Sequence, residues 1–478
     1  MLWLCVHLPD LPIEVCARGA PTDEPLVVVE GEGREQRVLA ATPAARRAGV
    51  QPGMRTSAAH ALVDRLGVRE RDPGSEREAL ERLAALSGRY TSHVSLAPPA
   101  GLLLEVGGSR NLFGGLGTLI ARLARDLAEV GYGGRFALAP TPLGATWLAA
   151  SGAETRALDH GALFKALAPL PLACLGLDAG REALLAGMGL RSLADCLRLP
   201  RDGLARRVGP EVLLALDRAF GRLPDPREPY VPPSRFSARL PLPSPVATSE
   251  ALLFPLRRLL LELAGFLEAR ALGARRLDFV LQHHRSRATG MTFDFVAPSR
   301  DARHWLLLVR ERLERLELGA PIEEIELRVE NPEDLGSRNL DLLAGEQTPE
   351  EGRASIVERL QARLGRDAVR GLASCPEHRP ERAWRYGEPG EEGRAAARAR
   401  RPLWLLPEPI PLEMREDAPW LDGALALEPE PERIESGWWD GRDVARDYYV
   451  ARDGGGRRLW VFRELRAPGR WFLQGVFG

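Results

Sequence analysis

Lysine is almost absent from this chain of 478 residues. Among its 65 basic residues only Lys165 is a lysine, and all the others are arginines. A GC-rich genome, which spells basic residues as arginine, is the simplest explanation of this usage. The chemical consequence is that any contact with phosphate must come from arginine, from a backbone N–H or from a helix N-terminus.

Long apolar runs and paired cysteines are also missing. No stretch reaches the ~18 apolar residues of a membrane-spanning helix. The first residues, MLWLCVHLPDLPIEV, lack a basic segment and soon meet Pro9 and Asp10, so they predict a buried strand and not a signal peptide. Because there is no CxxC pair, the sequence argues against a zinc site and a disulfide framework, and it favours the reducing cytoplasm. The five cysteines are Cys5, Cys16, Cys174, Cys196 and Cys375.

The composition shows little excess of either charge. The formal charge is −1, with 45% hydrophobic and 27% charged residues. These fractions are typical of a globular protein and exclude a mostly disordered or fibrous chain. The length predicts about three or four domains. Since the net charge is close to zero, a surface for nucleic acid must come from a local excess of arginine.

The first 165 residues alternate predicted strands and helices. The predicted elements are a strand and turn at 1–18, a helix at 76–87, a strand at 95–106 that Pro98 and Pro99 break near its start, a helix at about 115–129, a strand at 136–139 and a helix at about 143–151. This order, with short turns, predicts an α+β layer of the ferredoxin-like kind.

Three segments of different character follow. Residues 168–222 are predicted to form short helices separated by glycine-containing turns, and 224–233 hold five prolines, which is typical of a linker. Over 236–330 the predicted order is strand, helix, a two-stranded hairpin, helix and strand. That β-α-β-β-α-β order indicates a second ferredoxin-like unit.

The C-terminal part changes character again. A predicted helix at 353–364 precedes a stretch at 376–402, rich in proline, glycine, arginine and glutamate, that is expected to be extended or disordered. The turn at 453–456, Asp-Gly-Gly-Gly, predicts a hairpin. Seven of the ten tryptophans lie after residue 380, so this tail packs either a small β core of its own or the surface of a partner.

Taken in order, these segments resemble a Y-family translesion DNA polymerase over about residues 1–340. The phrases LWLCVHLPDLPIEV, LPLPSPV, GWWDGRDVARDYYV and LWVFREL are similar to the ImuB-type branch of that family, which belongs to bacterial SOS mutagenesis cassettes. The resemblance implies an α+β multidomain fold: a polymerase-like right hand with a C-terminal extension that has a small β-rich segment. The implied domains are a ferredoxin-like palm at 1–18 and 76–165, small fingers at 19–75, a helix-hairpin-helix thumb at 166–228, a linker at 229–235, a ferredoxin-like little finger at 236–338, a clamp-peptide and helical segment at 339–378 and a partner-binding region at 379–478.

The positions that the resemblance assigns to catalysis lack the residues of an active polymerase. Active members hold two metal ions ~3.5–4 Å apart with carboxylates. His7 falls where the first motif has an Asp, and Ala100 and Gly101 fall where the second motif has Asp-Glu. Mg²⁺ prefers oxygen ligands, so we expect no catalytic residue, no metal and no cofactor. A shifted register that offers Asp10 together with Glu105 is the remaining alternative.

The nucleotide pocket implied by the resemblance is also incomplete. The tyrosine of the fingers motif falls on Pro43, while the arginine three residues later is retained as Arg46. The palm lysine falls on Trp147, and Lys165, the only lysine, lies at the border of the thumb.

DNA binding in the thumb would use two hairpin turns, whose N–H groups grip phosphate without reading bases. The turn at 177–180 carries Asp178, which would repel phosphate. The turn at Gly209 has Arg206 and Arg207 beside it. A helical bundle packed for its own sake is the alternative.

The little finger has the stronger local charge. From 257 to 315 there are 12 arginines and 7 acidic residues, which leaves +5. Clustered arginine is the electrostatic signature of DNA backbone binding. A solvated Arg/Glu helix face is the alternative, and it fits 310–317 better than 275–287. The arginines we expect on DNA are Arg275 and Arg276, which enter a strand, and Arg285 and Arg287, which share the predicted turn with His283 and His284.

A leucine-rich peptide follows the little finger. Sliding-clamp peptides look like Gln-Leu-x-Leu-Phe, a polar anchor and two apolar side chains for a hydrophobic pocket. The matching residues here are Asn339, Leu340, Asp341, Leu342 and Leu343. Residues 361–364 are a second candidate, but they fall within a predicted helix.

The resemblance therefore implies a catalytically inactive homologue that binds primer-template or damaged DNA in repair and SOS translesion mutagenesis. Its implied partners are the sliding clamp, a RecA-like ImuA protein and an error-prone C-family DNA polymerase. The aromatic residues expected to meet partners in the tail are Trp438, Trp439, Tyr448, Tyr449, Trp460 and Trp471. The alternatives are a working Y-family polymerase with an unusual metal site, which lacks its three carboxylates, and a stand-alone DNA-binding repair module, which leaves the tail and the leucine peptide without a role.

Overall fold

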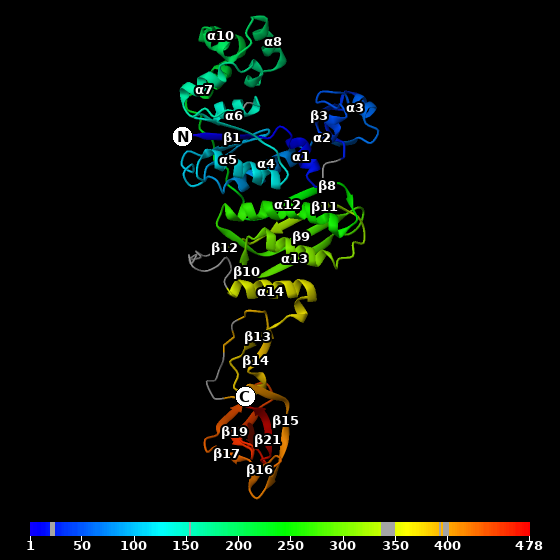
Figure 1. Cartoon of the computed structure of the whole chain (residues 1–478), viewed down its shortest axis with the longest axis vertical. Coiled ribbons are helices and arrows are strands. Elements are labelled where there is room, and N and C mark those ends of the chain that lie inside the picture. The colour runs from blue at the N-terminus through cyan, green and yellow to red at the C-terminus, as the bar shows by residue number, and fades with distance from the viewer. Residues whose placement is uncertain (20–23, 153, 336–348, 392, 395–400) are drawn as a thin grey trace. The chain divides into compact units, whose positions relative to one another are not determined.

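A computed structural model describes residues 1–19, 24–152, 154–335, 349–391, 393–394 and 401–478 (Figure 1). The chain divides into two compact units, Met1–Ala362 and Arg363–Gly478. Over the part of the chain that is described, no helix is long and apolar enough to cross a membrane.

The palm is built on a four-stranded sheet of order β5-β6-β1-β7, in which the neighbouring strands are antiparallel. Its elements run β-α-β-β-α-β, the order of the ferredoxin-like layer, with one strand more than the sequence predicted, and a further helix α6 follows. Their bounds are β1 (Trp3–His7), α4 (Pro73–Ser87), β5 (Val94–Ala97), β6 (Gly101–Glu105), α5 (Leu116–Glu129), β7 (Arg135–Ala139) and α6 (Pro142–Ala150).

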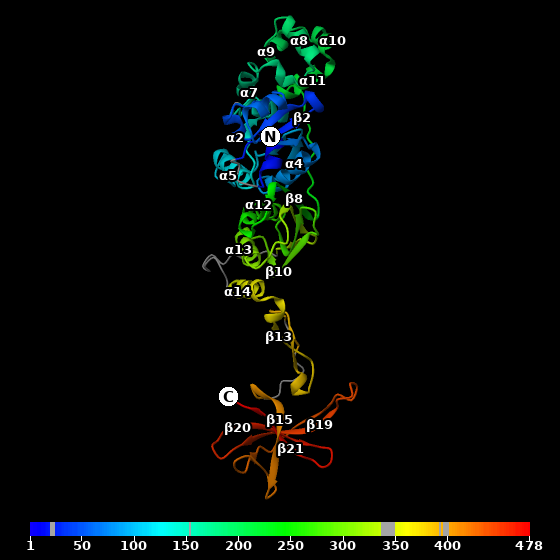
Figure 2. The same cartoon turned by 90° about the vertical axis from the view of Figure 1, so that its right-hand side faces the viewer.

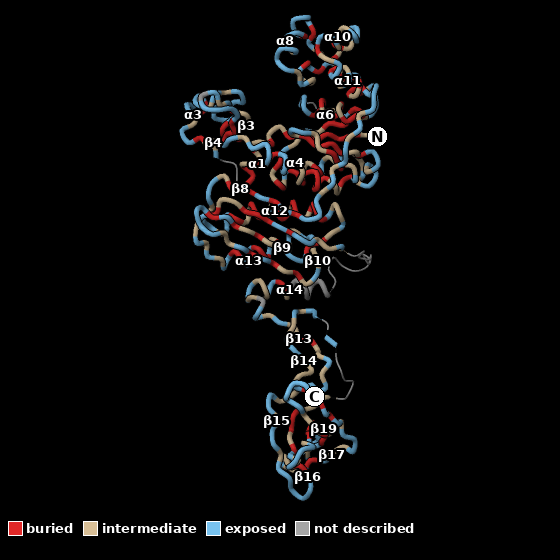
Figure 3. The backbone as a smooth tube through the Cα atoms, turned by 180° about the vertical axis from the view of Figure 1, so that it is seen from behind, coloured by how far each residue is buried: buried red, intermediate tan, exposed pale blue. Residues whose placement is uncertain are grey.

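Both faces of the palm sheet are buried, which explains the uninterrupted apolar run of β1. Leu4 and Val6 face a core shared with α4 and α5, while Trp3 and Cys5 face α6 and the thumb. Figure 3 shows buried backbone along these strands.

Two details of the palm differ from the prediction. The chain after β1 does not simply turn: it forms helix α1 (Leu11–Ala17), with a proline in its first turn, where its missing N–H costs nothing. The segment predicted as one broken strand is the hairpin β5–β6, because Pro98 and Pro99 remove the backbone donors that a continuous ladder needs.

The fingers have a small core of their own around Val27, Val29 and Val38. Their sheet has the order β3-β2-β4. The elements are β2 (Leu26–Glu30), η1 (Gly33–Glu35), β3 (Arg37–Ala41), α2 (Pro43–Arg47), α3 (Thr56–Leu62) and β4 (Gly67–Glu70).

The thumb is helical, and its apolar residues, such as Leu163, Leu185 and Leu216, join the core on the α6 side of the palm sheet. The elements are α7 (His160–Leu167), η2 (Leu172–Leu175), α8 (Ala179–Gly187), α9 (Leu193–Arg198), α10 (Arg201–Val208) and α11 (Pro210–Ala219).

The little finger has the predicted β-α-β-β-α-β order, but its strands are arranged differently from those of the palm. The spatial order is β10-β9-β11-β8, so the first strand of this unit lies at an edge and not in the middle. Helix α14 follows on the same unit, where Val296 N–H donates to Glu358 at 2.9 Å. The elements are β8 (Phe236–Val246), α12 (Ser249–Glu268), β9 (Leu272–His283), β10 (Thr289–Ser299), α13 (Ala302–Leu313), β11 (Ile322–Val329), β12 (Glu333–Asp334) and α14 (Pro349–Leu364).

The second unit contains a two-stranded sheet, β13–β14, and a seven-stranded antiparallel sheet. The hairpins of the larger sheet point in different directions in Figure 2. The turn at 453–456 joins β19 to β20, as predicted. The stretch predicted as extended or disordered contains η4 and β14, because Arg379 in it is bound by the carboxylate of the distant Asp440 and by that of the nearby Glu377. The elements are η3 (Arg366–Ala368), β13 (Gly371–Ser374), η4 (Pro380–Arg382), β14 (Trp384–Gly387), β15 (Trp404–Arg415), β16 (Ala418–Trp420), β17 (Ala426–Leu427), β18 (Glu432–Ser436), β19 (Val444–Arg452), β20 (Arg458–Glu464) and β21 (Trp471–Val476).

Strands β8 and β15 share an unusual feature. Each carries prolines at every second position, and each bulges away from its neighbour where the prolines lie, between Pro241 and Val246 in β8 and between Leu405 and Ile410 in β15. Proline cannot donate to a ladder and is confined to edges and bulges. The prolines are Pro241, Pro243 and Pro245 in β8 and Pro407, Pro409 and Pro411 in β15.

Candidate nucleic-acid interface and palm site

The palm sheet brings together the three positions that the resemblance assigned to metal ligands. In the register of β1 and β6, His7 lies opposite Gly101. The N–H of the next residue, Leu8, donates to the carbonyl of Ala100 at 2.7 Å. His7, Ala100 and Gly101 thus meet at one end of the sheet, and they contribute no carboxylate there.

His7 is half-buried and lies opposite Arg135 on β7. Burial, reinforced by the charge of Arg135, lowers the pKa of the His7 imidazole. The imidazole is therefore neutral at neutral pH, beside a permanent positive charge. In the described ranges no three His, Cys, Asp or Glu side chains are grouped so that they could hold a metal ion.

The alternative carboxylates, Asp10 and Glu105, do not meet. Asp10 forms an ion pair with Arg46 of α2. Glu105 lies at the far end of β6, four residues from Gly101, which corresponds to ~13 Å of strand. There its carboxylate accepts the N–H groups of Leu2 at 2.9 Å and Gly107 at 3.2 Å. A site that shares these two carboxylates is excluded by this geometry.

The other nucleotide-pocket positions have structural roles. Pro43 begins α2, after Thr42 caps it by accepting the N–H of Ala45 at 3.4 Å. Trp147 is buried in the core between palm and thumb. The guanidinium of Arg46, which the resemblance assigns to the nucleotide pocket, is paired with Asp10.

In the thumb, both predicted phosphate-binding turns are filled by the protein's own carboxylates. Asp178 caps α8 by accepting the N–H of Arg181 at 2.9 Å. Glu211 folds back over Gly209 at the start of α11, and Arg181 joins the two turns by pairing with Glu211 at 2.6 Å. These contacts favour the helical-bundle alternative at both turns. Arg206 and Arg207 remain exposed on α10.

The four little-finger arginines divide into two pairs. Arg275 is bound by Glu333 at 3.2 Å, and Arg276 is bound by Asp278 at 3.1 Å. Their charges are therefore partly neutralised on the sheet itself. The pairing of Arg275 with Glu333 could not be predicted from the sequence, because the two residues are distant along the chain.

Arg285 and Arg287 are different, because both are exposed in the β9–β10 turn and no acidic partner is found for them among the described residues. The turn is anchored by His283, whose two ring nitrogens contact the carbonyl of Ala320 and the hydroxyl of Thr289, each at 2.7 Å. A buried histidine thus supports a turn that presents two free guanidinium groups.

The little finger is joined to the palm by buried ions. Glu262 of α12 is 2% exposed; it forms an ion pair with Arg18, which is also buried, and it lies 3.3 Å from Arg82 of α4. Burial lowers the pKa of Arg18 to about 10. No local sequence signal predicts this cluster, since its members come from α4, α12 and the end of α1.

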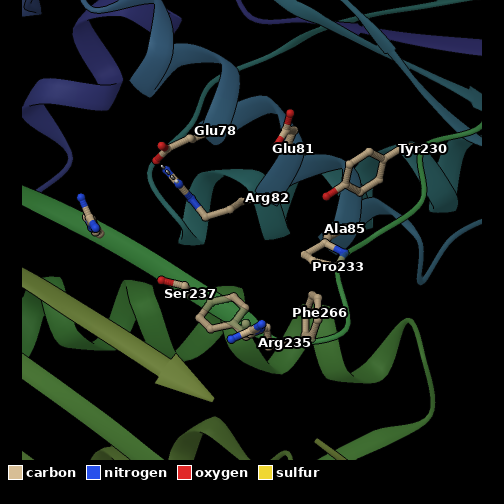
Figure 4. Close-up of a pocket in the computed structure, with 11 residues that line it drawn as sticks. Glu78, Glu81, Arg82, Ala85, Tyr230, Pro233, Arg235, Ser237 and Phe266 are labelled. Atoms are coloured by element: carbon tan, nitrogen blue, oxygen red, sulfur yellow. Dashed lines mark ion pairs between the residues drawn. The ribbon is translucent and has the colours of Figure 1, made fainter. Parts of the chain in front are cut away.

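A cavity of about 270 Å³ lies beside this joint, between α4, the linker and the little finger (Figure 4). Its charged lining residues are already paired within the protein: Arg82 with Glu262, Arg239 with Glu326 at 3.5 Å, and Arg235 with Glu330 at 3.1 Å. None of the predicted site residues lines it. We therefore describe it as a gap between packed surfaces.

The predicted clamp-binding residues Asn339, Leu340, Asp341, Leu342 and Leu343 lie outside the described residues. The second candidate, 361–364, lies within α14, as expected.

The aromatic tail residues do not form one surface. Tyr448, Trp460 and Trp471 are buried, so their assignment to a partner surface was wrong: they build the core of the C-terminal sheet. Tyr449 is half-buried beside Trp471. Of the six aromatic residues assigned to partners, Trp438 and Trp439 are largely exposed, at 81% and 59%. Each of the two alternatives for the tail therefore holds for some of its aromatic residues: some build a core of its own, and others lie on an exposed surface.

Comparison with known proteins defines the class of this chain. Residues 14–150 match the impB/mucB/samB family. Together with the palm, fingers, thumb and little finger, this match defines a Y-family polymerase-like protein. Solved structures with a similar fold include the insertion ternary complex of Dbh DNA polymerase, which is 18% identical with a TM-score of 0.41, and DinB from Sulfolobus solfataricus, which is 18% identical with a TM-score of 0.39. Each alignment covers 70% of this chain and 100% of the other.

The curated relatives include Protein ImuB from two strains of Caulobacter vibrioides. Each is 30% identical over 458 residues, which covers 90% of this chain and all of the relative. The chain belongs to the ImuB family of Y-family polymerase-like proteins. Its role is related to DNA damage and translesion mutagenesis.

Proposed function

We propose that this protein is a non-catalytic, cytoplasmic adaptor of SOS translesion mutagenesis, which binds damaged or primer-template DNA and brings other proteins to it. The observation that carries the proposal is the palm site. His7 lies opposite Gly101, and Leu8 N–H donates to Ala100; His7, Ala100 and Gly101, which the resemblance assigns to the metal ligands, include no carboxylate, and this supports the proposal. Phosphoryl transfer in this family depends on carboxylate-held metal ions.

DNA would be held mainly by the little finger. Arg285 and Arg287 present unpaired charge from a turn that His283 anchors. Arg206 and Arg207 of the thumb offer a second exposed pair. Contacts of this kind bind phosphate and do not read bases, which suits a protein that must act at varied lesions.

Partner recruitment would use two other regions. The leucine peptide at 339–343 is proposed to bind the sliding clamp, and the second unit is proposed to bind the RecA-like ImuA protein and the error-prone C-family polymerase. The exposed Trp438 and Trp439 support a docking role for that unit, since exposed tryptophans are frequent hot spots of interfaces.

A primer-extension assay with Mg²⁺ and with Mn²⁺ tests the loss of catalysis. The purified chain should add no nucleotide to an undamaged or lesion-containing template, while electrophoretic mobility shifts show that it binds the same DNA. Extension that persists through purification and disappears on Asp10→Ala would refute the proposal and support a working polymerase.

A further inference from the structure

The segment Gly437, Trp438, Trp439, Asp440 and Gly441, called the Trp loop below, displays two tryptophans at the surface of the second unit. The two indole rings lie edge to face, with centroids 5.5 Å apart. Such an exposed pair of large apolar rings is costly in water and is commonly retained where it meets a partner.

The Trp loop is held in place by the buried side chain of Arg379, which is 2% exposed. The guanidinium of Arg379 donates to both carboxylate oxygens of Asp440, at 3.0 and 2.9 Å, and to the carbonyl of Arg442 at 3.0 Å. Glu377 accepts a further bond from Arg379 at 2.7 Å. The charges meet in a fork-to-fork geometry, which fixes orientation as well as position.

Gly437 makes this fastening possible. Its φ is +91°, and a Cβ at this position would lie 2.4 Å from Nη1 of Arg379. A side chain at this position would displace the guanidinium, so glycine lets Arg379 reach Asp440 and the carbonyl of Arg442, and these bonds hold the loop in place. A loop ordered before binding loses less conformational entropy when it docks.

The charge around the Trp loop discriminates between kinds of partner. Asp440 is neutralised by Arg379 and by Arg382, the latter at 2.5 Å, and Asp443 pairs with Arg466. Within the described residues, Arg442, which directly follows the loop, is an exposed cation for which no acidic partner is found. Nucleic-acid surfaces need several free cations to neutralise phosphates, so a single arginine fits a protein better than DNA.

We propose that the Trp loop is a preorganised protein-docking site, with Trp438 and Trp439 entering an apolar pocket of a partner protein and Arg442 meeting a carboxylate at its rim. Arg379 is a positioning residue that acts through the loop. This inference rests on the proposed role of the second unit in binding partner proteins, and it names the surface that performs it.

The test uses the full chain, with the purified RecA-like protein and the purified C-family polymerase of the same cassette as probes, and a thymidine oligonucleotide as the nucleic-acid probe. Replacing both Trp438 and Trp439 by alanine should weaken binding to at least one protein probe by about 30-fold or more, as for two hot-spot side chains. Trp404→Ala is the matched control, because Trp404 is also exposed, in β15 of the same unit, but lies outside the loop.

A mutant cycle tests the role of Arg379. Arg379→Ala alone should weaken the same interaction, but added to the double tryptophan variant it should cost no further affinity, since it acts through the rings. Circular dichroism and the unfolding midpoint check that each variant is folded. Additive losses would show that Arg379 supports the unit as a whole and would overturn its role as a positioning residue.

The outcomes separate this inference from the proposed function. If the wild-type chain binds neither protein probe, the proposed partner role of the second unit fails. If it binds and the double tryptophan variant binds equally well, the Trp loop is the wrong surface although the partner role stands. Loss of oligonucleotide binding alone would identify the loop as a DNA-stacking surface and overturn the protein-docking proposal.

Discussion

Arg46 and Asp10 neutralise each other across the junction of fingers and palm. The resemblance assigns Arg46 to the nucleotide pocket, and Asp10 is the carboxylate nearest in sequence to His7, which the resemblance assigns to a metal-ligand position. In the structure these two partly exposed side chains form a small contact with each other.

Asp10→Ala should therefore have little effect on the free energy of unfolding, and it should not change how that free energy responds to Mg²⁺. Exposed ion pairs contribute about 0.2–1 kcal/mol, and both side chains here are more than a third exposed. We expect the free energy of unfolding, measured with urea, to change by no more than this amount. The wild type and the variant should show the same midpoint with and without Mg²⁺, whereas a Mg²⁺-dependent shift lost in the variant would reveal a residual metal site.

DNA binding should depend unequally on the two arginine pairs of the little finger. Replacing Arg285 and Arg287 by alanine should lower the slope of log K against log salt by about 1.8, at roughly 0.9 for each phosphate contact on duplex DNA. The matched variant, Arg275→Ala with Arg276→Ala, removes the same formal charge but should change the slope by less than half as much, because Glu333 and Asp278 already neutralise these arginines. Equal losses in the two variants, or no change in either, would place the DNA surface elsewhere.

Glu262→Gln should destabilise the first unit strongly. It leaves the buried guanidinium of Arg18 without its counter-ion, and breaking a buried pair on one side costs about 3–5 kcal/mol. Glu268→Gln is the control, since that residue is 43% exposed and its ion pair with Arg89 should contribute less than about 1 kcal/mol. Limited proteolysis at the 229–235 linker measures whether the joint between palm and little finger has loosened. Equal resistance of the two variants would contradict the role assigned to the buried ions.

The contribution of Glu14 to the stability of the fold should depend on pH with the opposite sign to that of most carboxylates. Burial is the main cause that raises its pKa from 4.5 to about 7, although Gly133 N–H donates to it at 2.8 Å. The folded chain therefore favours the protonated form, and this stabilisation is full below pH 4.5 and is lost as the pH rises through 7. Glu14→Gln should leave stability nearly unchanged near pH 5 and raise it by about 1–3 kcal/mol near pH 8. Thermal unfolding at the two pH values measures this, and a larger gain at the acidic value would reverse the assignment.

The clamp peptide should act independently of the tail. Replacing Leu342 and Leu343 by alanine removes two apolar side chains whose burial contributes about 1.5–3 kcal/mol each, so clamp binding in a pull-down should disappear. DNA binding should persist in the same variant. The variant with both Trp438 and Trp439 replaced by alanine should still bind the clamp. If this variant loses clamp binding and the leucine variant does not, the clamp-binding peptide is not at 339–343.

Much of the fold follows from local patterns, and most of the site does not. The helix at 76–87, the hairpin at 453–456 and the β-α-β-β-α-β order of the little finger could be predicted because apolar periodicity and turn chemistry are local properties, whereas the palm was predicted with three strands and has four. Helix α1 was missed because residues 1–18 were predicted as a strand and a turn; Pro12 lies in the first turn of this helix, where proline is tolerated.

The site residues depend on contacts between distant segments. Arg275 has the same sequence signature as Arg285, but Glu333 binds the first, while the second stays free. Tyr448 and Trp438 are likewise similar in sequence terms, and only the pairing of β19 with β20 shows that Tyr448 stacks on Trp460 inside the core. Pairings of this kind arise from tertiary structure, so no pattern along the chain contains them.

The alternating prolines of β8 and β15 have a consequence for how this protein associates with others. An exposed strand normally offers a ladder of donors that any extended peptide can join, including a misfolded neighbour. In β8, which lies at the edge of its sheet, every second donor over residues 241–245 is missing; in β15, which lies between β16 and β21, the same pattern interrupts the ladder with β21. The edge formed by β8 therefore offers no continuous ladder to an extended peptide, and pairing of two copies of the chain through it is disfavoured.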